Sequence, residues 1–489
     1  MITNATVFID VNKQFIGGEW REGKSNTTYR IEDPFDNSLI AEVRMASKED
    51  VDEAYQTAKK AQKQWADTSK EEKIKVLRNA MKLLEDNKSE VIDILIRESG
   101  SSTLKANIEV GAALGIMNEA CSFPERMEPV TVQSHFPGKE NQIHRKAAGV
   151  VGIISPFNFP FHLAMRSIAP AIATGNAVVH KPDIQTGISG GAIISKIFEL
   201  AGLPKGVLNL VLTNRNEIGD YFIEHPIPKI ISFTGSTPAG QHVGSVAGKN
   251  LKRVALELGG NNPFVVLKDA NVDAAVNAAI FGGYLHQGQI CMSINRIFVD
   301  RFIYDEFVAK YIDKASKLPY GDPKNPEVIV GPIINEKHIN KILSLVETAK
   351  KEGANVVLEG KREGNVLTPF VITDVNNAMT IAQSEIFGPV VSIIPFKTEE
   401  EALKLANSTE FGLSSAVFTS DLDKGIEFAQ QIESGMTHVN DQTVNDEPNV
   451  PFGGEKNSGL GRYNGEWALE EFTTMKWISV QKGERKYPF

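Results

Sequence analysis

Residues 286–296, HQGQICMSINR, place one of the two cysteines of the 489-residue chain in a polar stretch. A cysteine becomes a nucleophile as its thiolate, which nearby backbone N–H groups or positive charge favour. The alternative is a buried and inert thiol, which is the usual state of a free cysteine. On this stretch alone, the inert thiol is the better-supported interpretation of Cys291.

Two side chains upstream could assist a nucleophile. Glu257, in ELGGNNP, stands between two leucines, and a carboxylate in apolar surroundings has a raised pKa that suits a general base. An ion pair at a strand end would explain Glu257 equally well. Asn158, in SPFNFP, could donate a hydrogen bond to a developing oxyanion, although asparagine beside proline also commonly forms turns.

A third segment, FTGSTPAG, is suited to binding a phosphate. Gly235, Ser236 and Gly240 stand where an expected strand passes into a helix, and the N–H groups at a helix N-terminus bind anions. The segment matches neither the GxGxxG fingerprint nor a P-loop, so by itself it is a weak signal.

The elements that would position these residues alternate along the chain. From residue 148, short β-rich runs are separated by helical windows, which predicts βαβ units and largely parallel sheets. Ligands of such sheets bind beyond the carboxyl ends of the strands, so the loops after the strands are where a site is expected. The expected strands are GVVGIIS, NAVVHKP, VLNLVL, KIISFTG, NPFVVL and NRIFVD.

The segments around this region also have clear patterns. Ser47 and Ser69 each precede an apolar repeat with helical spacing, which predicts two amphipathic helices. Residues 128–150 alternate on both sides of FPGKEN, which predicts a β-hairpin. Because a lone hairpin is marginal in water, we expect it to pair with MKWISVQ at residues 475–481 or with a second subunit.

Composition limits the function classes. The length predicts two large domains, and a net charge of −9 without a block of basic residues argues against a nucleic-acid partner. The start lacks the pattern of a signal peptide, and the most apolar stretch is too interrupted to span a membrane. Two cysteines exclude a disulfide framework, and the scattered histidines predict no metal site. We therefore expect a cytoplasmic protein with no membrane partner.

Seven motifs together carry a resemblance. SPFNFP, KPD, FTGST, ELGGNNP, GQIC, EIFGPV and PFGGEKNSGLGR stand in the order and spacing of the NAD(P)-dependent aldehyde dehydrogenase superfamily, over nearly the whole chain. The resemblance implies an α/β fold with a Rossmann-like NAD(P)-binding domain (1–125 and 148–256), an α/β catalytic domain (257–460) and a β oligomerisation hairpin (126–147 and 461–489). It also implies a homodimer or homotetramer.

The resemblance assigns catalytic roles. Cys291 would attack the aldehyde carbon, and the Asn158 amide with the Cys291 backbone N–H would hold the oxyanion. Glu257, 34 residues before the cysteine, would activate the water that hydrolyses the thioester. Glu466, in YNGEW, resembles a family glutamate on the proton route around this base.

The resemblance also implies a cofactor groove. Phe157 stands where many members have tryptophan, which leaves the groove apolar. Ile184 stands where many NAD-preferring members have a glutamate that repels a 2′-phosphate, so the sequence predicts use of both NAD and NADP. The implied groove residues are Ile154, Ser155, Pro156, Phe157, Lys181, Gly235, Ser236, Gly240, Leu258, Glu385 and Phe387.

The aldehyde would bind against an apolar wall similar to that of the benzaldehyde, vanillin and salicylaldehyde dehydrogenase branch. This wall suits a flat aromatic ring and would also accept a medium-chain aliphatic aldehyde, because apolar pockets discriminate such ligands weakly. Its residues are Phe159, Leu163, Ile290, Met292, Val450 and Phe452.

Two alternatives stay open. A semialdehyde dehydrogenase would need a cation for a second carboxylate, for which Arg166 is the nearby candidate, although a structural ion pair explains Arg166 better. A catalytically idle structural or binding homologue is a different class, and the joint presence of Cys291, Glu257 and Asn158 argues against it.

Overall fold

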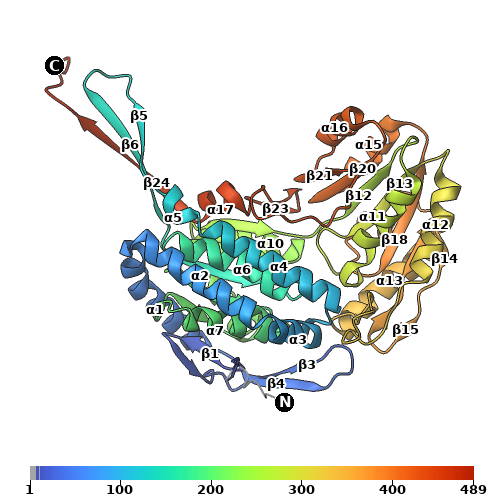
Figure 1. The fold of residues 1–489 in the computed structure, drawn as a ribbon, viewed down its shortest axis with the longest axis horizontal. Helices are drawn as coiled ribbons and strands as arrows, with labels where there is room; N and C mark the ends of the chain where they lie inside the picture. The colour runs from blue at the N-terminus through green and yellow to red at the C-terminus, as the bar shows by residue number, and fades with distance from the viewer. Residues whose placement is uncertain (1–6, 10) are drawn as a thin grey trace.

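The computed structural model describes residues 7–9 and 11–489. Its elements form two lobes that lie side by side, and an arm projects away from the first lobe (Figure 1). Each lobe is built on one large twisted sheet. In the part of the chain that the structure describes, no helix combines the length and apolarity needed to cross a bilayer.

The first sheet has a parallel centre, as the alternating pattern predicts. The expected strands GVVGIIS, NAVVHKP, VLNLVL and KIISFTG all form. In spatial order the eight strands are β2 (Glu19–Arg21), β1 (Gln14–Ile16), β9 (Leu208–Leu210), β8 (Ala177–Pro182), β7 (Val150–Ser155), β10 (Ile230–Thr234), β11 (Arg253–Glu257) and β23 (Gly459–Leu460).

Helices cover both faces of this sheet, because alternate side chains of each buried strand point to opposite faces. Val151 and Ile153 belong to the core under one set of helices, whereas Val150 packs with α1. Ser47 closes a capping box on α1, and Ser69 caps α2, as predicted. The helices on one face are α2 (Lys70–Asp86), α3 (Lys88–Ser99), α4 (Thr103–Ala120), α6 (Pro160–Ala173) and α7 (Ile193–Leu200), and those on the other are α1 (Lys48–Asp67) and α10 (Thr237–Lys249).

The second sheet contains the expected strands NPFVVL and NRIFVD at its centre and is also covered on both faces. Its spatial order is β14 (Asn355–Leu358), β17 (Phe370–Thr373), β18 (Val390–Phe396), β13 (Ile294–Asp300), β12 (Asn262–Val266), β20 (Ser414–Phe418) and β21 (Met436–Val439). Its helices are α11 (Val272–Tyr284), α12 (Tyr304–Ser316), α13 (Glu336–Glu352), α15 (Glu399–Asn407) and α16 (Leu422–Gln431). The chain passes from the first sheet to the second between β11 and β12.

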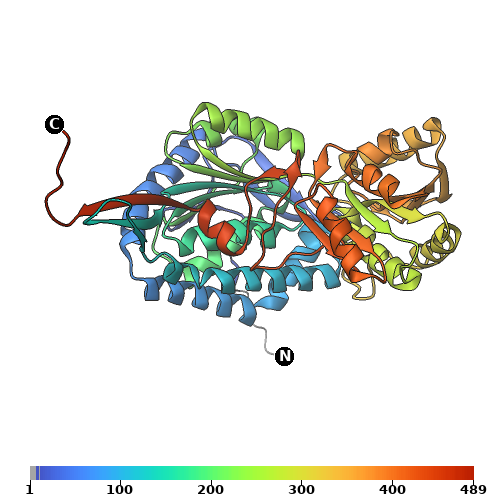
Figure 2. The same cartoon turned by 90° about the horizontal axis from the view of Figure 1, so that it is seen from above.

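The arm is the predicted hairpin, with β5 (Val130–Gln133) and β6 (Lys139–Ala147) as its strands. β24 (Thr473–Gln481) pairs with β6 along nine residues, so the first of the two expected partners is confirmed. Figure 2 shows the arm extending away from both lobes. Its side chains include apolar ones that face outward, such as Trp477, which is 63% exposed.

Candidate active site

Cys291 lies in the loop between a short 3-10 helix, Leu285–Gly288, and β13, and it is 9% exposed. The segment from Leu285 to the cysteine, called the cysteine loop below, has an unusual backbone, because His286, Gln287 and Gly288 all have positive φ angles. A Cβ at Gly288 would meet the Gly388 carbonyl oxygen at 2.2 Å, so only glycine fits there. The polar residues that precede the cysteine therefore belong to a tightly built loop.

Two glutamines of this loop tie it to the rest of the molecule. Gln287 Nε2 donates to the carbonyl oxygens of Gly100 (3.1 Å) and Pro332 (2.8 Å). Gln289 Oε1 accepts from the Ile334 N–H at 3.0 Å. Because these bonds are buried, the polar character of HQGQIC serves to fix the position of the thiol.

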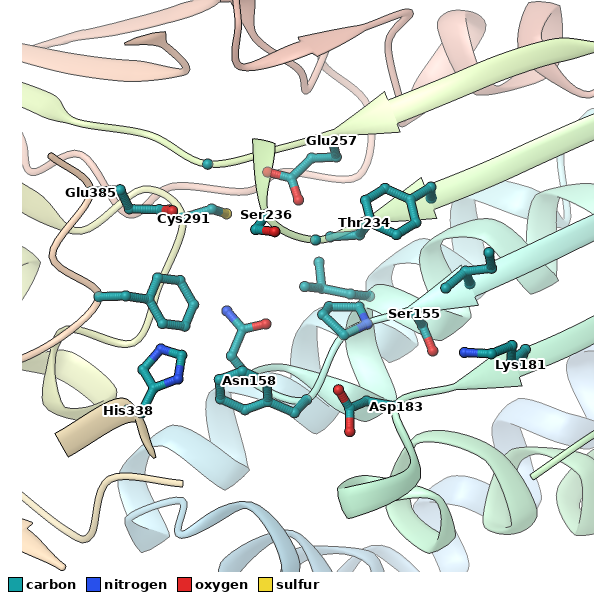
Figure 3. Close-up of a pocket in the computed structure, with 18 of the residues that line it drawn as sticks. Ser155, Asn158, Lys181, Asp183, Thr234, Ser236, Glu257, Cys291, His338 and Glu385 are labelled. Carbon is teal, nitrogen blue, oxygen red and sulfur yellow. The ribbon is translucent and has the colours of Figure 1, made fainter. Parts of the chain in front are cut away.

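Asn158 lies in the loop after β7, and its side chain joins this loop to the cysteine loop. Asn158 Nδ2 donates to the Gln289 carbonyl oxygen at 2.9 Å. A side-chain amide carries two N–H donors, so one remains for a ligand. Figure 3 shows the Asn158 amide pointing into the same space as Cys291 and Glu257.

Glu257 ends β11 and is fully buried. Neither carboxylate oxygen has a hydrogen-bond partner, and the nearest cation is Arg166, whose Nη2 lies 3.6 Å from Glu257 Oε2. Burial raises the pKa of Glu257, and the Arg166 charge opposes this effect. Burial, together with the charge of Glu257, also raises the pKa of the Cys291 thiol well above its ordinary value. The cysteine is therefore protonated at rest and has a proton acceptor beside it.

Arg166 belongs to a buried chain of charges that the sequence did not predict as a whole. Its Nη1 lies 3.5 Å from Asp446 Oδ2, and the same oxygen accepts a hydrogen bond from His162 Nε2 at 2.8 Å. Arg166 also stacks on the Phe452 ring, 4.3 Å from its centroid. The ion-pair role expected of Arg166 is therefore confirmed, with Glu257 and Asp446 as its partners.

A cavity of about 400 Å³ opens in front of Cys291 and Glu257 (Figure 3). The predicted cofactor residues that line it are Ile154, Ser155, Pro156, Phe157, Lys181, Gly235, Ser236, Glu385 and Phe387. Asp183, Phe233, Thr234, Gly259, His338 and Lys341 line it as well and were not predicted.

Gly240 and Leu258 do not line this cavity. A Cβ at Gly240 would meet Leu258 Cδ2 at 2.1 Å, so the absence of a side chain there lets α10 pack closely on Leu258. Both residues therefore position the start of α10 and do not face the cavity.

The donors in this cavity fit a dinucleotide. Ser236 is the N-cap of α10 but makes no side-chain capping bond, and the first turn holds no acidic residue, so its N–H groups remain free for a phosphate. The carboxylate of Glu385 faces the cavity, where burial raises its pKa to about 7. Lys181 adds a cation, and Asp183 adds a carboxylate near it.

A second cavity of about 190 Å³ meets the first at three shared residues: Asn158, Leu163 and Cys291. The predicted substrate residues Phe159, Leu163, Ile290, Met292 and Phe452 line it. Val450 does not; it is 43% exposed. The unpredicted lining is Ile108, Ala112, Phe281, Leu285 and Val444, with His162, Asn445 and Asp446 as polar members.

Glu466 lies in neither cavity. It stands in α17 (Gly465–Glu471), is 46% exposed, and pairs with Arg126 and, at 3.2 Å, with Arg145 of β6. A proton route through Glu466 therefore has no support in this geometry. Tyr463, just before α17, is the residue of this segment that is buried beside Arg166. Its hydroxyl donates to the Ala255 carbonyl oxygen at 3.0 Å, and the Arg166 guanidinium lies over its ring.

Comparison with known proteins decides the family. A sequence profile described as "Aldehyde dehydrogenase family" matches residues 20–478. The chain belongs to the aldehyde dehydrogenase family. As a member of it, the protein is an oxidoreductase that acts on aldehydes, and the resemblance drawn from the seven motifs is confirmed.

Individual aldehyde dehydrogenases match almost end to end. A vanillin dehydrogenase of Corynebacterium glutamicum is 52% identical, with 97% of this chain and 98% of that protein covered. A benzaldehyde dehydrogenase of Bacillus subtilis is 51% identical, with 98% and 99% covered. The crystal structure of an NAD-dependent benzaldehyde dehydrogenase from Corynebacterium glutamicum superposes with a TM-score of 0.90 at 47% identity, covering 98% of this chain and 99% of that one. The expected fold is therefore confirmed.

Proposed function

We propose that this aldehyde dehydrogenase oxidises aromatic aldehydes to carboxylic acids, with NAD as its cofactor. The observation that carries the proposal is the place of Cys291, where a cavity with the donors for a dinucleotide meets a smaller apolar one. The relatives named for benzaldehyde and vanillin support the same substrate class.

The first chemical step belongs to the cysteine. The Cys291 thiol gives its proton to Glu257, directly or through water, and the sulfur attacks the aldehyde carbon. The free Asn158 amide N–H and the Cys291 backbone N–H then hold the oxyanion of the thiohemiacetal. When bound, the nicotinamide supplies the acceptor for the hydride that leaves this carbon.

The second step is hydrolysis of the thioester. Glu257, after it has released the thiol's proton to solvent, takes a proton from a water molecule, and the resulting hydroxide attacks the thioester carbon. The C–S bond then breaks, the carboxylic acid leaves, and the Cys291 thiolate regains a proton from Glu257. A buried carboxylate without hydrogen-bond partners has the raised pKa that this role requires, and Arg166 keeps it ionisable. Asn158 serves the same oxyanion position in both steps.

The residues present fit the cofactor, and we assign Lys181 to the adenosine ribose, Gly235 and Ser236 to the pyrophosphate, and Glu385 to the nicotinamide ribose. Dual use of NAD and NADP was predicted from Ile184, which is buried and lies outside the cavity lining. The carboxylate of Asp183 lies inside it and would oppose a 2′-phosphate. The ratio of kcat/KM for the two cofactors tests this point: we expect a large preference for NAD, and comparable values would favour the dual use predicted from Ile184 instead.

The substrate side favours an aromatic ring over a semialdehyde. The lining is mostly aromatic and aliphatic, and the two buried cations nearby are already engaged, Arg166 with Glu257 and Asp446 and Lys105 with Glu109. A second carboxylate on the substrate would therefore find no free cation in the described part of this cavity. A medium-chain aliphatic aldehyde is the alternative that the apolar lining accepts.

One experiment tests the proposal. NADH absorbance is followed with benzaldehyde, vanillin, hexanal and succinate semialdehyde, with Cys291→Ala as the inactive control. We expect the highest kcat/KM for an aromatic aldehyde and no turnover in the variant. Equal or better turnover of hexanal would overturn the substrate class, and full activity of the variant would overturn the mechanism.

We also propose that the arm of β5, β6 and β24 joins subunits into a homodimer or homotetramer in the cytoplasm. Its exposed apolar residues, among them Val130, Met475 and Trp477, support an interface there. Sedimentation of the purified protein distinguishes these assemblies from a monomer, and a monomer would contradict the proposal.

A further inference from the structure

A fully buried lysine, which the mechanism does not use, lies behind the Asn158 loop. Lys105, in α4, has its ammonium group 2.6 Å from the Asn158 carbonyl oxygen, to which it donates a hydrogen bond. The same nitrogen donates to Ser101 Oγ at 2.9 Å and to Glu109 Oε2 at 2.5 Å. All three of its donors are therefore used inside the protein.

Glu109 continues this network to the next residues of the loop. Its second oxygen, Oε1, accepts from the N–H groups of Phe161 at 2.9 Å and His162 at 3.2 Å. These groups open α6, a helix that has no side-chain cap of its own. A carboxylate from α4 therefore caps α6, and Lys105 holds the residue two positions before that helix.

The pair also fixes one wall of the aldehyde cavity. The Lys105 ammonium group lies 4.2 Å from the centroid of the Phe159 ring, close enough for a cation–π interaction. Phe159 lines the second cavity, and Asn158 lines both. One buried ion pair thus fixes the positions of Asn158 and Phe159, two neighbouring residues that would face the reacting aldehyde.

Packing alone does not account for this arrangement. Burying two charges costs more than burying apolar residues of similar volume, and such replacements are often neutral or stabilising. An apolar pair would, however, leave the Asn158 carbonyl and two helix N–H groups without partners. The Lys105 and Glu109 charges are therefore the hydrogen-bond partners of these backbone groups. The same backbone carries the Asn158 side-chain amide, which faces the expected oxyanion.

We propose that the Lys105–Glu109 pair is a positioning device for the oxyanion donor, acting through the backbone of Asn158. The inference rests on the proposed function of Asn158. Oxyanion stabilisation depends on donors placed within hydrogen-bond distance of the developing charge, and a displacement of about 1 Å can cost about 100-fold in rate. Neither residue touches the substrate, so both act only through the loop.

The test is a double-mutant cycle on the rate of NADH formation in a single turnover with benzaldehyde. Lys105→Met with Glu109→Gln removes both charges but keeps an acceptor for the α6 N–H groups. We expect the rate to fall by about 10- to 100-fold in the otherwise unchanged protein. In an Asn158→Ala background, which is itself slower by about 100- to 1,000-fold, the same change should have less than about a twofold effect.

Controls separate positioning from stability. Lys196→Met with Glu199→Gln removes a less buried ion pair of α7, outside both cavities, and should leave the rate unchanged. With benzaldehyde that carries deuterium on its aldehyde carbon, the isotope effect on kcat should rise in the Lys105→Met/Glu109→Gln variant. A purely structural defect would not cause this rise. If the double variant does not fold, Glu109→Asp, which keeps both charges and withdraws the carboxylate by one methylene, enters the same cycle.

The outcomes are distinct. An equal loss of rate with and without Asn158 would overturn the inference while leaving the proposed function intact. A wild-type rate in the folded Lys105→Met/Glu109→Gln variant would also overturn the inference. If Asn158→Ala itself leaves the rate unchanged, the assigned role of Asn158 fails, and the positioning role fails with it.

Discussion

Replacing Gly259 with alanine should weaken NAD binding without disturbing the nucleophile. A Cβ at Gly259 would lie 2.5 Å from Glu385 Oε2 and 2.8 Å from its Cδ, whereas ordinary contacts begin near 3.4 Å. The Glu385 carboxylate must therefore move by about 0.9 Å, and its bond from the Gly260 N–H, 3.2 Å long, would be lost or stretched.

The expected size of the effect follows from the role assigned to Glu385. Hydrogen bonds that involve a charged group contribute about 1.5–3 kcal/mol, so losing this contact with the ribose should raise the Kd for NAD about 10- to 150-fold. Titration calorimetry measures the Kd, and the rate of Cys291 alkylation by iodoacetamide without cofactor should stay at the wild-type value.

Gly248→Ala is the matched control. Gly248 lies in α10 with no atom within 4 Å of its Cβ position, so alanine there should be neutral or slightly stabilising and should leave the Kd unchanged. A Kd of the Gly259 variant within twofold of wild type, with normal thermal stability, would refute the assignment of Glu385 to the cofactor.

Three further changes have expected outcomes. Glu257→Gln should slow the first step, because the thiol loses its proton acceptor, and should stop acid release after it, so stopped-flow absorbance should show a slowed rise that ends at about one NADH per active site; steady wild-type turnover would contradict the role of this base. Arg166→Met removes the charge that lowers the pKa of Glu257, so this pKa rises further and the acid limb of the plot of kcat against pH should move to higher pH. Asp446→Asn removes a charge that raises the pKa of Glu257, so the acid limb should move to lower pH. Identical profiles in both variants would exclude this electrostatic account. Trp477→Lys on the outer face of the arm should shift sedimentation towards smaller species, and an unchanged assembly would place the interface elsewhere.

The parts of the fold that the sequence predicts are those with local patterns. Buried parallel strands such as β7 and β12 are continuous apolar runs between turn residues, and Ser47 marks a helix start by a capping box. β11 was not among the six expected strands, although a strand end at Glu257 was one of two interpretations of that residue, because RVALE combines an exposed arginine with a terminal glutamate.

The candidate catalytic residues were proposed from motifs, whereas the residues that support them in the structure were not. Lys105 and Glu109 lie on a helix, where charged residues are ordinarily interpreted as exposed, and their partners are about fifty residues away in sequence. The position of Glu466 could not be predicted for a related reason. This glutamate follows a recognisable motif, but α17 directs its side chain to Arg126 and Arg145, away from Glu257.

The closure of the first sheet has a consequence for the order of folding. β23 adds the last strand beside β11, and Ala468, Leu469 and Phe472 complete an apolar core that otherwise comes from residues before 231. During synthesis, the first lobe must therefore keep part of its core and the β11 edge uncovered until residues 459–472 emerge, and contacts of such long sequence separation form slowly. The strand that ends in Glu257 is thus among the last to be enclosed, so a nascent chain completes the Cys291 loop before Glu257 has its final environment.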